Sequence, residues 1–424
     1  MTTTDKNAAT RLLSQKTVSK ALMPGGWHVV AMLAFVGMLN YLDRTTITTM
    51  RGSIVAAIPM SDAQFGLLTS VFLWVYGIFS PFVGFLADRI SRSKVIIVSL
   101  FAWSLATLFT GFSDTFGELL TARALMGISE ACYFPAALAL IMDYHRGSTR
   151  SLASGVNMVG IMIGSGLGFL GGWIAEKYAW TLAFHIFGIV GIVYALILIF
   201  LLRDVSQSQL PIEEKTPREK VKFWDAVKTL FSMRSYILML LFWAALGTIG
   251  WLIVGWLPTF FKERFGLTQT MAGLYATGYF YPAGIVGLLL GGFIADQWNK
   301  VNTRGRILTP VIGLAIASPC VFIASQTSVL WIAIVFFMIY NLMRMFGDAN
   351  MMPILSMIAD SRYRATGYGI FNLFATVIGG LSIYVGGMLR DADIGFSKIF
   401  QASSILLLVC AILMYFVRPS GDNE

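Results

Sequence analysis

The chain has 424 residues, of which 57% are hydrophobic and 12% are charged, and its formal net charge is +9. Soluble domains have about 45–50% apolar and about 25% charged residues, so this composition excludes a soluble enzyme, a disordered chain and a nucleic-acid-binding protein. The three cysteines, Cys132, Cys320 and Cys410, lie in apolar runs and are too scattered for a disulfide framework or a metal site. We therefore expect a membrane protein.

Twelve apolar stretches are long enough to cross a bilayer as helices, because about 20 apolar residues span its hydrocarbon core. A transmembrane barrel would need alternating segments of about ten residues instead, so the predicted fold class is an all-α membrane protein. In chain order, the predicted spans are 27–50, 64–87, 95–113, 118–142, 152–174, 183–202, 236–261, 271–295, 307–325, 329–358, 365–389 and 398–417.

The positions of the basic residues predict how these spans cross the membrane. If the N-terminus is cytoplasmic, 22 of the 31 Lys and Arg residues lie on the cytoplasmic side, 6 lie on the other side and 3 lie within spans. Because short cytoplasmic loops carry the excess of Lys and Arg, we expect both termini in the cytoplasm. We also expect the protein to lie in the plasma (inner) membrane. No cleavage-like site follows the first apolar run, so we expect no signal peptide.

The two halves of the chain repeat one another's landmarks. The pattern Gly-Phe-x-Ala-Asp at 84–88 recurs at 292–296. In the same way, Glu130 is followed by a proline five positions later, and so is Asp348. Such repeats are typical of transporters, which bind substrate near the midplane between the halves. The predicted organisation is an N-terminal cytoplasmic segment (1–26), a six-helix bundle (27–202), a cytoplasmic linker (203–235), a second six-helix bundle (236–417) and a cytoplasmic tail (418–424).

Four glycines recur at every fourth position of the fifth predicted span. They are Gly160, Gly164, Gly168 and Gly172. Residues four apart share one face of a helix, and small residues on that face let a neighbouring helix approach closely. The pattern predicts close helix packing at this span.

Residues 84–94 resemble the signature between the second and third helices of the major facilitator superfamily, Gly-x-Leu-Ala-Asp-Arg-x-Gly-Arg-(Arg/Lys). Ser91 and Ser93 depart from it at the second glycine and the last basic position. In that superfamily the Asp and Arg of the motif close a cytoplasmic gate. The alternative is a cytoplasmic loop that is basic only because of the orientation of the protein. It would explain Arg89 and Arg92 but not the presence of Gly84 and Asp88 at the positions of the motif. The gate residues that the resemblance implies are Gly84, Asp88, Arg89, Arg92 and, from the repeat, Asp296.

Six ionisable residues fall inside predicted spans. An ionised group at the bilayer centre costs at least about 2.5–3.5 kcal/mol, so such groups usually pair or face a cavity. The alternative is that they neutralise one another and only fix helix packing. Two of them are four positions apart on one helix and can pair directly. The six are Asp43, Arg44, Arg123, Glu130, Arg344 and Asp348.

The chemistry of these residue types suggests separate roles. A carboxylate in a low-dielectric site can exchange a proton near neutral pH, whereas arginine keeps its charge and offers a planar fork of donors to a carboxylate. Three arginines in the pathway therefore favour an anionic substrate. Arg123 lies close to the outer end of its span, so its side chain can alternatively extend to the membrane surface.

Three stretches resemble the anion:cation symporter family, which includes sialin and the proton-coupled hexuronate and galactonate carriers. They are 40–44, 74–81 and 123–135. The resemblance implies that the acids of the first and fourth spans handle protons, with the proton as coupling ion and no other cofactor. It implies substrate contacts from arginines and a tyrosine. The implied proton-coupling residues are Asp43 and Glu130, and the implied substrate-binding residues are Arg44, Tyr76 and Arg123.

The N-terminal half is equally similar to the spinster family, whose members move sphingoid lipids and lysophospholipids. A lipid tail needs an apolar cavity, whereas a sugar acid needs many hydrogen-bonding groups. The C-terminal spans contain several polar residues, which favours the sugar acid. Of these residues, Arg344, Asp348 and Asn372 are further substrate-binding candidates. The expected partners are a small anionic substrate, or a lysolipid in the alternative reading, together with the lipid bilayer.

Other classes of function fit less well. A polytopic membrane enzyme is disfavoured, because no paired His or Cys constellation is present and the three histidines have no metal-ligand spacing. The sequence contains no Gly-Lys motif of the kind that binds the phosphates of ATP, which argues against transport driven by ATP hydrolysis. We expect no enzyme, no metal and no nucleic acid, and a monomer. The leading prediction is a proton-coupled transporter whose halves rock around a central site, while a non-transporting sensor of the same fold stays open.

Overall fold

The computed structural model describes residues 23–87, 90–145, 149–205, 223–360 and 362–419, with side chains for all of these except 81–87 and 365. Within these ranges the protein is helical and contains no strand, which confirms the predicted all-α class. The first half contains α2 (Gly26–Thr49), α3 (Arg51–Ala57), α4 (Asp62–Ala87), α5 (Arg92–Thr110), α6 (Phe116–Glu130), α7 (Tyr133–Tyr144), α8 (Arg150–Gly166), α9 (Phe169–Lys177) and α10 (Trp180–Leu201). The second half contains α12 (Phe223–Ser232), α13 (Arg234–Phe265), α14 (Gln269–Gly273), the π-helical segment η3 (Leu274–Tyr279), α15 (Phe280–Asn299), α16 (Gly305–Gln326), α17 (Leu330–Ile358), α18 (Arg364–Asp391) and α19 (Phe396–Tyr415).

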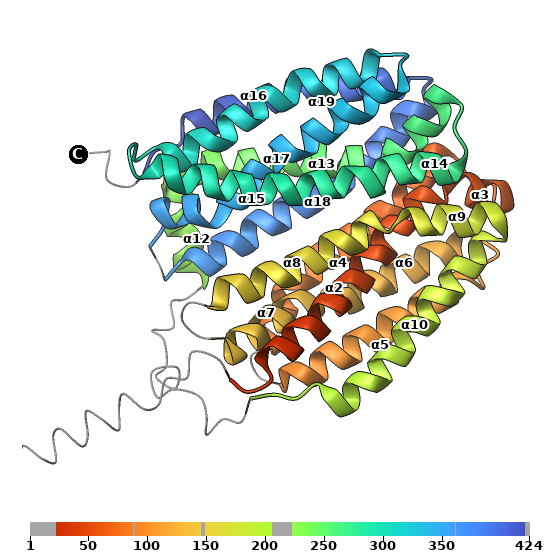
Figure 1. Ribbon diagram of the computed structural model, residues 1–424, viewed down its shortest axis with the longest axis horizontal. Helices are drawn as coiled ribbons and strands as arrows, with labels where there is room; N and C mark the ends of the chain where they lie inside the picture. The colour runs from red at the N-terminus through yellow and green to blue at the C-terminus, as the bar shows by residue number, and fades with distance from the viewer. Residues whose placement is uncertain (1–22, 88–89, 146–148, 206–222, 361, 420–424) are drawn as a thin grey trace, which may run out of the picture.

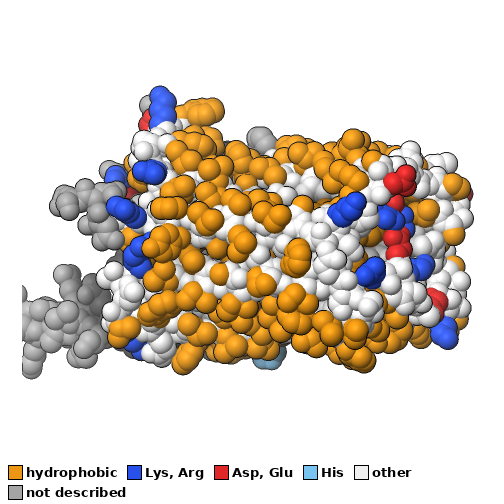
Figure 2. All heavy atoms as spheres, turned by 90° about the horizontal axis from the view of Figure 1, so that it is seen from above, with side chains coloured by type: hydrophobic (Ala, Val, Ile, Leu, Met, Phe, Trp, Pro, Cys, Tyr) orange, Lys and Arg blue, Asp and Glu red, His pale blue; other side chains and the backbone are white. Residues whose placement is uncertain are grey.

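The helices have the lengths that a membrane requires. Among the described residues, eleven helical segments are long and apolar enough to span a bilayer. The helix α2 is not one of them, since it carries Asn40, Asp43 and Arg44, but it packs within the bundle against α8 and serves as the twelfth. Each of the twelve predicted spans overlaps these helices. Figure 2 shows a wide hydrophobic belt, with charged side chains gathered toward the two ends of the molecule.

The helices form two groups that lie side by side (Figure 1). The N-terminal group contains α2 to α10 and the C-terminal group contains α13 to α19. We call the end where α10 stops at Leu201 and α13 begins at Arg234 the linker end, and the opposite end, where α13 stops at Phe265, the far end. The groups meet mainly along α4 and α18, with further contacts of α8 with α15 and of α9 with α14.

Several predicted spans are broken into two helices, and one break positions a charged residue. The span predicted at 118–142 divides into α6 and α7, so Glu130 is the last residue of α6. Pro135 stands near the start of α7, and its missing N–H cannot bond to the carbonyl of Ala131. The α-helix is therefore interrupted after Glu130, and this carboxylate lies at the interruption, in the middle of the span Phe116–Tyr144.

The glycines of α8 provide the close packing that the sequence predicts. A Cβ atom at Gly160 would collide with the backbone of Ala34, and one at Gly164 would collide with the backbone of Met38. Both contacts are with α2, which carries Asp43 and Arg44. The glycines therefore hold the charged helix tightly within its group.

The predicted linker at 203–235 contains a helix that the sequence analysis did not anticipate. Residues 223–232 form α12, which packs against α13 and α18. The reason is that Ala226 and Leu230 lie four residues apart and bury one side of this segment. Residues 206–222 of the predicted linker, residues 1–22 and the end of the predicted tail, 420–424, lie outside the described part of the chain.

Candidate functional site

A buried ion pair joins the first and fourth spans. The Nε of Arg44, on α2, donates a hydrogen bond of 2.7 Å to Oε2 of Glu130, at the end of α6. The side chains of this pair are 5% and 0% exposed. Removing one partner of such a pair leaves an uncompensated buried charge, which costs about 3–5 kcal/mol. The buried charge of Arg44 is therefore compensated by Glu130.

Aromatic rings enclose the guanidinium of Arg44. Its central carbon lies 4.5 Å from the ring centroids of both Tyr41 and Tyr76, and 5.0 Å from that of Phe72. The faces of aromatic rings attract cations, and this attraction is stronger where water is excluded. The cage stabilises the positive charge of Arg44, and this contribution does not depend on the charge of Glu130.

A second acid and a second arginine lie in the same interior. Asp43 accepts a hydrogen bond of 3.1 Å from Oγ1 of Thr107, on α5. Arg123 is fully buried, and its Nε donates to the carbonyl oxygen of Leu68 at 3.4 Å. Its guanidinium also lies 4.9 Å from the ring centroid of Phe72. The alternative that Arg123 reaches the membrane surface is wrong, because its side chain points into the interior between α4 and α6.

The C-terminal group contributes a more accessible ion pair. Nη1 of Arg344 lies 3.2 Å from Oδ2 of Asp348, one turn later on α17, as their spacing predicts. The side chains are 17% and 30% exposed, against 5% and 0% for the Arg44 pair. A ligand can therefore reach the Arg344 pair without first displacing a buried partner.

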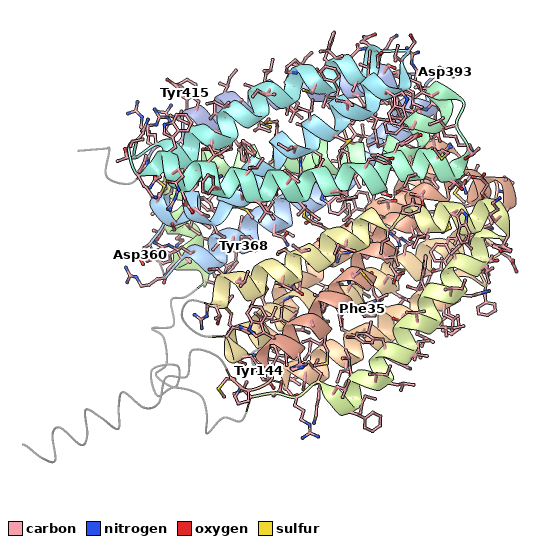
Figure 3. All side chains as sticks on the ribbon, in the orientation of Figure 1. Phe35, Tyr144, Asp360, Tyr368, Asp393 and Tyr415 are labelled. Carbon is pink, nitrogen blue, oxygen red and sulfur yellow. The ribbon has the colours of Figure 1, made fainter. Side chains whose placement is uncertain are left out.

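Tyrosines link the two charged clusters across the boundary between the helix groups. Tyr41 lies within electrostatic range of Asp348, and Tyr281 of α15 lies within range of both Tyr41 and Arg344. Tyr368 of α18 is within range of Tyr41 and Asp348 as well. Figure 3 places Tyr368 at the boundary between the groups. Electrostatic interactions thus connect cationic and hydroxyl groups from both halves, and we call these residues together the central site.

Of the remaining sequence candidates, Asn372 lies one helical turn after Tyr368 on α18, and the predicted gate residues lie elsewhere. Asn372 is half-buried, and no hydrogen bond of its side chain is found within the described part of the chain. At the linker end, Arg92 pairs with Asp143 of α7, and Asp296 pairs with Arg306 at 2.9 Å. Of the other residues predicted to form the gate, Gly84 belongs to α4, whereas Asp88 and Arg89 lie outside the described residues.

At the far end, four charged side chains form a ring that crosses both groups. Arg51 pairs with Asp62, and it lies 3.9 Å from Glu263. Arg390 lies 2.7 Å from Glu263 and 3.6 Å from Asp62. The carboxylate of Asp391 also accepts from the backbone N–H groups of residues 62 and 63, at the start of α4. The ring therefore holds α4 against the far ends of α13 and α18.

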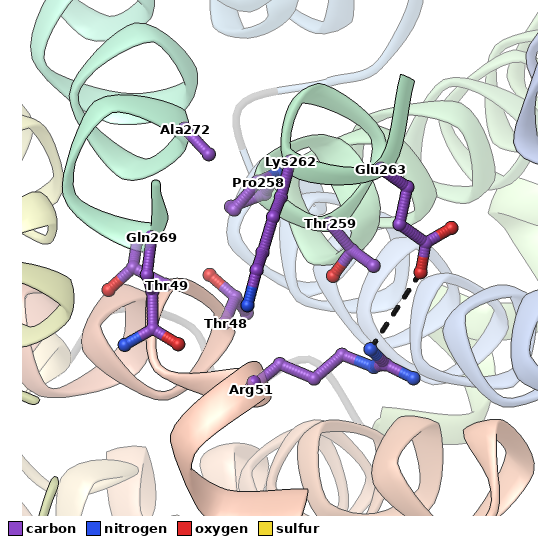
Figure 4. Close-up of a pocket in the computed structure, with 10 residues that line it drawn as sticks. Thr48, Thr49, Arg51, Pro258, Thr259, Lys262, Glu263, Gln269 and Ala272 are labelled. Atoms are coloured by element: carbon purple, nitrogen blue, oxygen red, sulfur yellow. Dashed lines mark ion pairs between the residues drawn. The ribbon is translucent and has the colours of Figure 1, made fainter. Parts of the chain in front are cut away.

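A small pocket lies beside this ring and has none of the predicted site residues in its wall. Its volume is about 140 Å³. Figure 4 shows the Arg51–Glu263 pair on one side and Lys262, between Thr48 and Pro258, on the other. The pocket is therefore a far-end feature that is distinct from the central site.

The predicted site residues did not include five residues of the central site, namely Tyr41, Phe72, Thr107, Tyr281 and Tyr368. Tyr41 stands three residues before Arg44 and Phe72 stands four before Tyr76, so helical spacing could have placed both rings beside Arg44. The sequence gives no comparable signal for Thr107 or Tyr368, because their contacts join distant helices.

Among the described residues, two groups of membrane-spanning helices with buried ion pairs in their interior are typical of a membrane transporter rather than an enzyme. Residues 33–383 match the family model of the Major Facilitator Superfamily. The chain therefore belongs to the Major Facilitator Superfamily, as residues 84–94 suggested.

The curated relatives of this chain include proteins of two kinds. The chain is 30% identical over 319 residues to "Protein spinster homolog 3" of Danio rerio, a match that covers 70% of this chain and 62% of that protein. It is 26% identical over 440 residues to the "Probable galactarate/D-glucarate transporter GudP" of Bacillus subtilis (strain 168), covering 94% of each. The chain thus spans about 60% of the length of several spinster relatives, but nearly all of GudP.

Solved structures share the fold. A bacterial homologue of the human lysosomal transporter spinster, in an inward-facing and unoccupied conformation, superposes with a TM-score of 0.79 at 24% identity. The superposition covers 94% of this chain and 97% of that one. This likeness shows that the chain shares the fold of that transporter.

Proposed function

We propose that this protein is a proton-coupled symporter of a small organic anion, such as a sugar acid or another carboxylate, and that it works by alternating access. The observation that carries the proposal is the ion pair between Arg44 and Glu130 inside an aromatic cage. This pair combines a cation that can bind a carboxylate with a carboxylate that can bind a proton, and both are out of water.

Protonation of Glu130 would couple the two events. Once neutral, Glu130 no longer compensates the charge of Arg44, which the cage keeps desolvated. An anionic substrate can then replace Glu130 as the partner of the guanidinium. Release of the substrate would favour deprotonation of Glu130 and the return of the ion pair. Asp43, held by Thr107, is the second proton-coupling candidate.

The C-terminal half would complete the substrate site. Arg344 is accessible, and its carboxylate partner Asp348 is the most exposed member of the two central ion pairs. Tyr281 and Tyr368 add hydroxyl groups on the same side of the boundary. A sugar acid offers one or two carboxylates and several hydroxyls, which suits two arginines surrounded by tyrosines. The similarity to GudP over 94% of the chain supports this substrate class.

The second candidate is a spinster-like transporter of lysophospholipids or sphingolipids, either proton-linked or facilitative. The 30% identity to a spinster homologue favours it. In that case the arginines would bind a charged headgroup, and the lipid tail would need an apolar path.

The setting we propose is the plasma (inner) membrane, with both termini cytoplasmic, which makes the linker end the cytoplasmic end. A monomer suffices for this mechanism, because both halves of the central site come from one chain. The coupling ion is the proton, and no further cofactor is needed.

The test is a transport assay in proteoliposomes that contain a pH-sensitive dye. Sugar acids and simple carboxylates are added one at a time, beside lysophospholipids and sphingoid bases. Proton entry with a soluble acid, absent in protein-free liposomes, is the expected result. No response to any soluble acid, together with movement of a labelled lysolipid, would replace the symporter proposal with the lipid transporter.

A further inference from the structure

The short helix α12 has an apolar side that the protein only partly covers. Ala226 and Leu230 are 2% and 0% exposed, and Leu230 lies against Gly367 of α18. In contrast, Trp224 is 70% exposed and Phe223 is 58% exposed. Half of the apolar side therefore packs on the helix bundle, and the other half faces outward.

The exposed aromatic residues occupy one sector of the helix. At about 100° per residue, Phe223, Phe231 and Trp224 fall within an arc of about 100° that adjoins the buried sector. The rings of Phe223 and Trp224 touch, with centroids 5.6 Å apart. The opposite sector is polar and contains Asp225, Lys228, Thr229 and Ser232. This division is the pattern of a helix that lies in a membrane interface.

The position of α12 places this aromatic sector at the edge of the bilayer. The spanning helix α13 begins at Arg234, and one residue separates it from Ser232, the end of α12. Ten residues of helix are only about 15 Å long, too short to cross a hydrocarbon core of about 30 Å. Because α12 is tied to the first residue of a span, it lies at the linker-end interface (Figure 1).

The aromatic sector continues into the outward-facing surface of the next helix. Ile237 and Leu241 are 37% and 51% exposed, lie four residues apart and share one face of α13. Phe231 is 41% exposed, and its ring lies 5.9 Å from that of Tyr236 at the start of α13. The apolar surface that meets lipid on α13 therefore extends onto α12.

Basic residues stand where lipid headgroups would be. Lys228 is next to Trp224 around the helix, and Arg234 is at the start of α13; both are exposed, and neither forms an ion pair within the described part of the chain. Exposed Lys and Arg at a membrane surface attract anionic lipids. Tryptophan is enriched at this same depth.

We propose that α12 is an interfacial anchor that inserts Phe223, Trp224 and Phe231 at the boundary between headgroups and acyl chains, beside anionic lipids held by Lys228 and Arg234. Because α12 packs on α13 and α18, the anchor fixes the linker ends of these two helices at the membrane surface. The inference depends on the membrane location of the chain and is independent of the substrate.

The test uses the full chain in nanodiscs and isolates the fluorescence of one tryptophan. Subtracting the emission of Trp224→Phe from that of the wild-type protein removes the ten tryptophans common to both. Lipids brominated near the headgroup should quench the Trp224 signal at least twofold more than lipids brominated near the chain end. Aqueous iodide should quench it little. Trp103→Phe is the control, because Trp103 is fully buried and its signal should respond to neither reagent.

A lipid-composition arm tests the charged part of the anchor. When phosphatidylglycerol replaces part of the phosphatidylcholine, lipids brominated near the headgroup should quench Trp224 of the wild-type protein more strongly. The same change of lipid should increase this quenching less in Lys228→Glu. Strong iodide quenching without bromolipid quenching would overturn the proposal, since it would place α12 in water. Protection from both reagents would also overturn it, because the aromatic sector would then contact protein.

Discussion

Replacing Glu130 by Gln tests the coupling of protons to substrate. The glutamine keeps an oxygen that can accept from Nε of Arg44 but cannot lose or gain a proton, so the variant mimics the protonated state permanently. We expect it to bind and exchange substrate but not to accumulate it. The measurement is uptake of labelled substrate into proteoliposomes under an imposed pH gradient, beside counterflow without a gradient.

The expected size of the effect follows from the driving force. One pH unit is worth about 1.4 kcal/mol, so coupling of one proton to one monoanion gives about tenfold accumulation. The Glu130→Gln variant should reach only the external concentration. Loss of one partner of a buried ion pair costs up to about 3–5 kcal/mol, and the retained hydrogen-bond acceptor and the cage should keep the loss of stability below that range.

A matched control lies on the same helix. Glu118 is an exposed residue of α6 that completes the capping box at Thr115, and glutamine can fill the same position. Glu118→Gln should therefore accumulate substrate like the wild-type protein. If Glu130→Gln also accumulates substrate tenfold under one pH unit, Glu130 does not couple the proton and the reasoning is wrong.

Three further changes test other parts of the account. Arg44→Lys keeps the charge but loses the planar fork of donors, so the apparent affinity for an anionic substrate should fall tenfold or more; an unchanged apparent KM would exclude this contact. Gly164→Val should prevent stable folding, as followed by size-exclusion chromatography, whereas Gly155→Val on the same helix meets no atom within 4 Å and should fold; equal behaviour of the two would refute the packing argument. Glu263→Gln removes the pairs with both arginines of the far-end ring, Arg390 included, and partly exposed pairs contribute at most about 1 kcal/mol each. A cysteine introduced in the wall of the far-end pocket should then react faster with an impermeant thiol reagent, by up to about 30-fold for the loss of two such pairs. An unchanged rate would show that the ring does not hold this end closed.

Much of the fold could be predicted because a bilayer restricts the choice so strongly. Twelve apolar stretches were enough to identify the helices, and the spacing of glycines in the fifth span predicted its close packing. The sequence did not specify that α2 is the partner in this contact. The helix α12 escaped prediction because it is only ten residues long and is surrounded by charge, so its amphipathic pattern is visible only once its buried side is known.

The central site was predictable in its charges but not in its partners. Charges inside a span are rare enough to point to Arg44, Glu130 and Arg344 directly. The pairing of Arg344 with its neighbour follows from helical spacing. In contrast, the contact of Arg44 with Glu130 joins residues 86 positions apart, and the burial of Arg123 depends on how α4 and α6 face each other. Only the packed structure specifies those relations.

The most direct test of the central claim is the affinity for substrate as a function of pH, measured by equilibrium binding to the purified full chain. If protonation of Glu130 frees Arg44, binding takes up a proton, so the wild-type protein should bind the anion more tightly as the pH falls. Glu130→Gln should bind tightly at every pH tested. A wild-type affinity that does not change with pH, or the same pH dependence in both proteins, would contradict the claim.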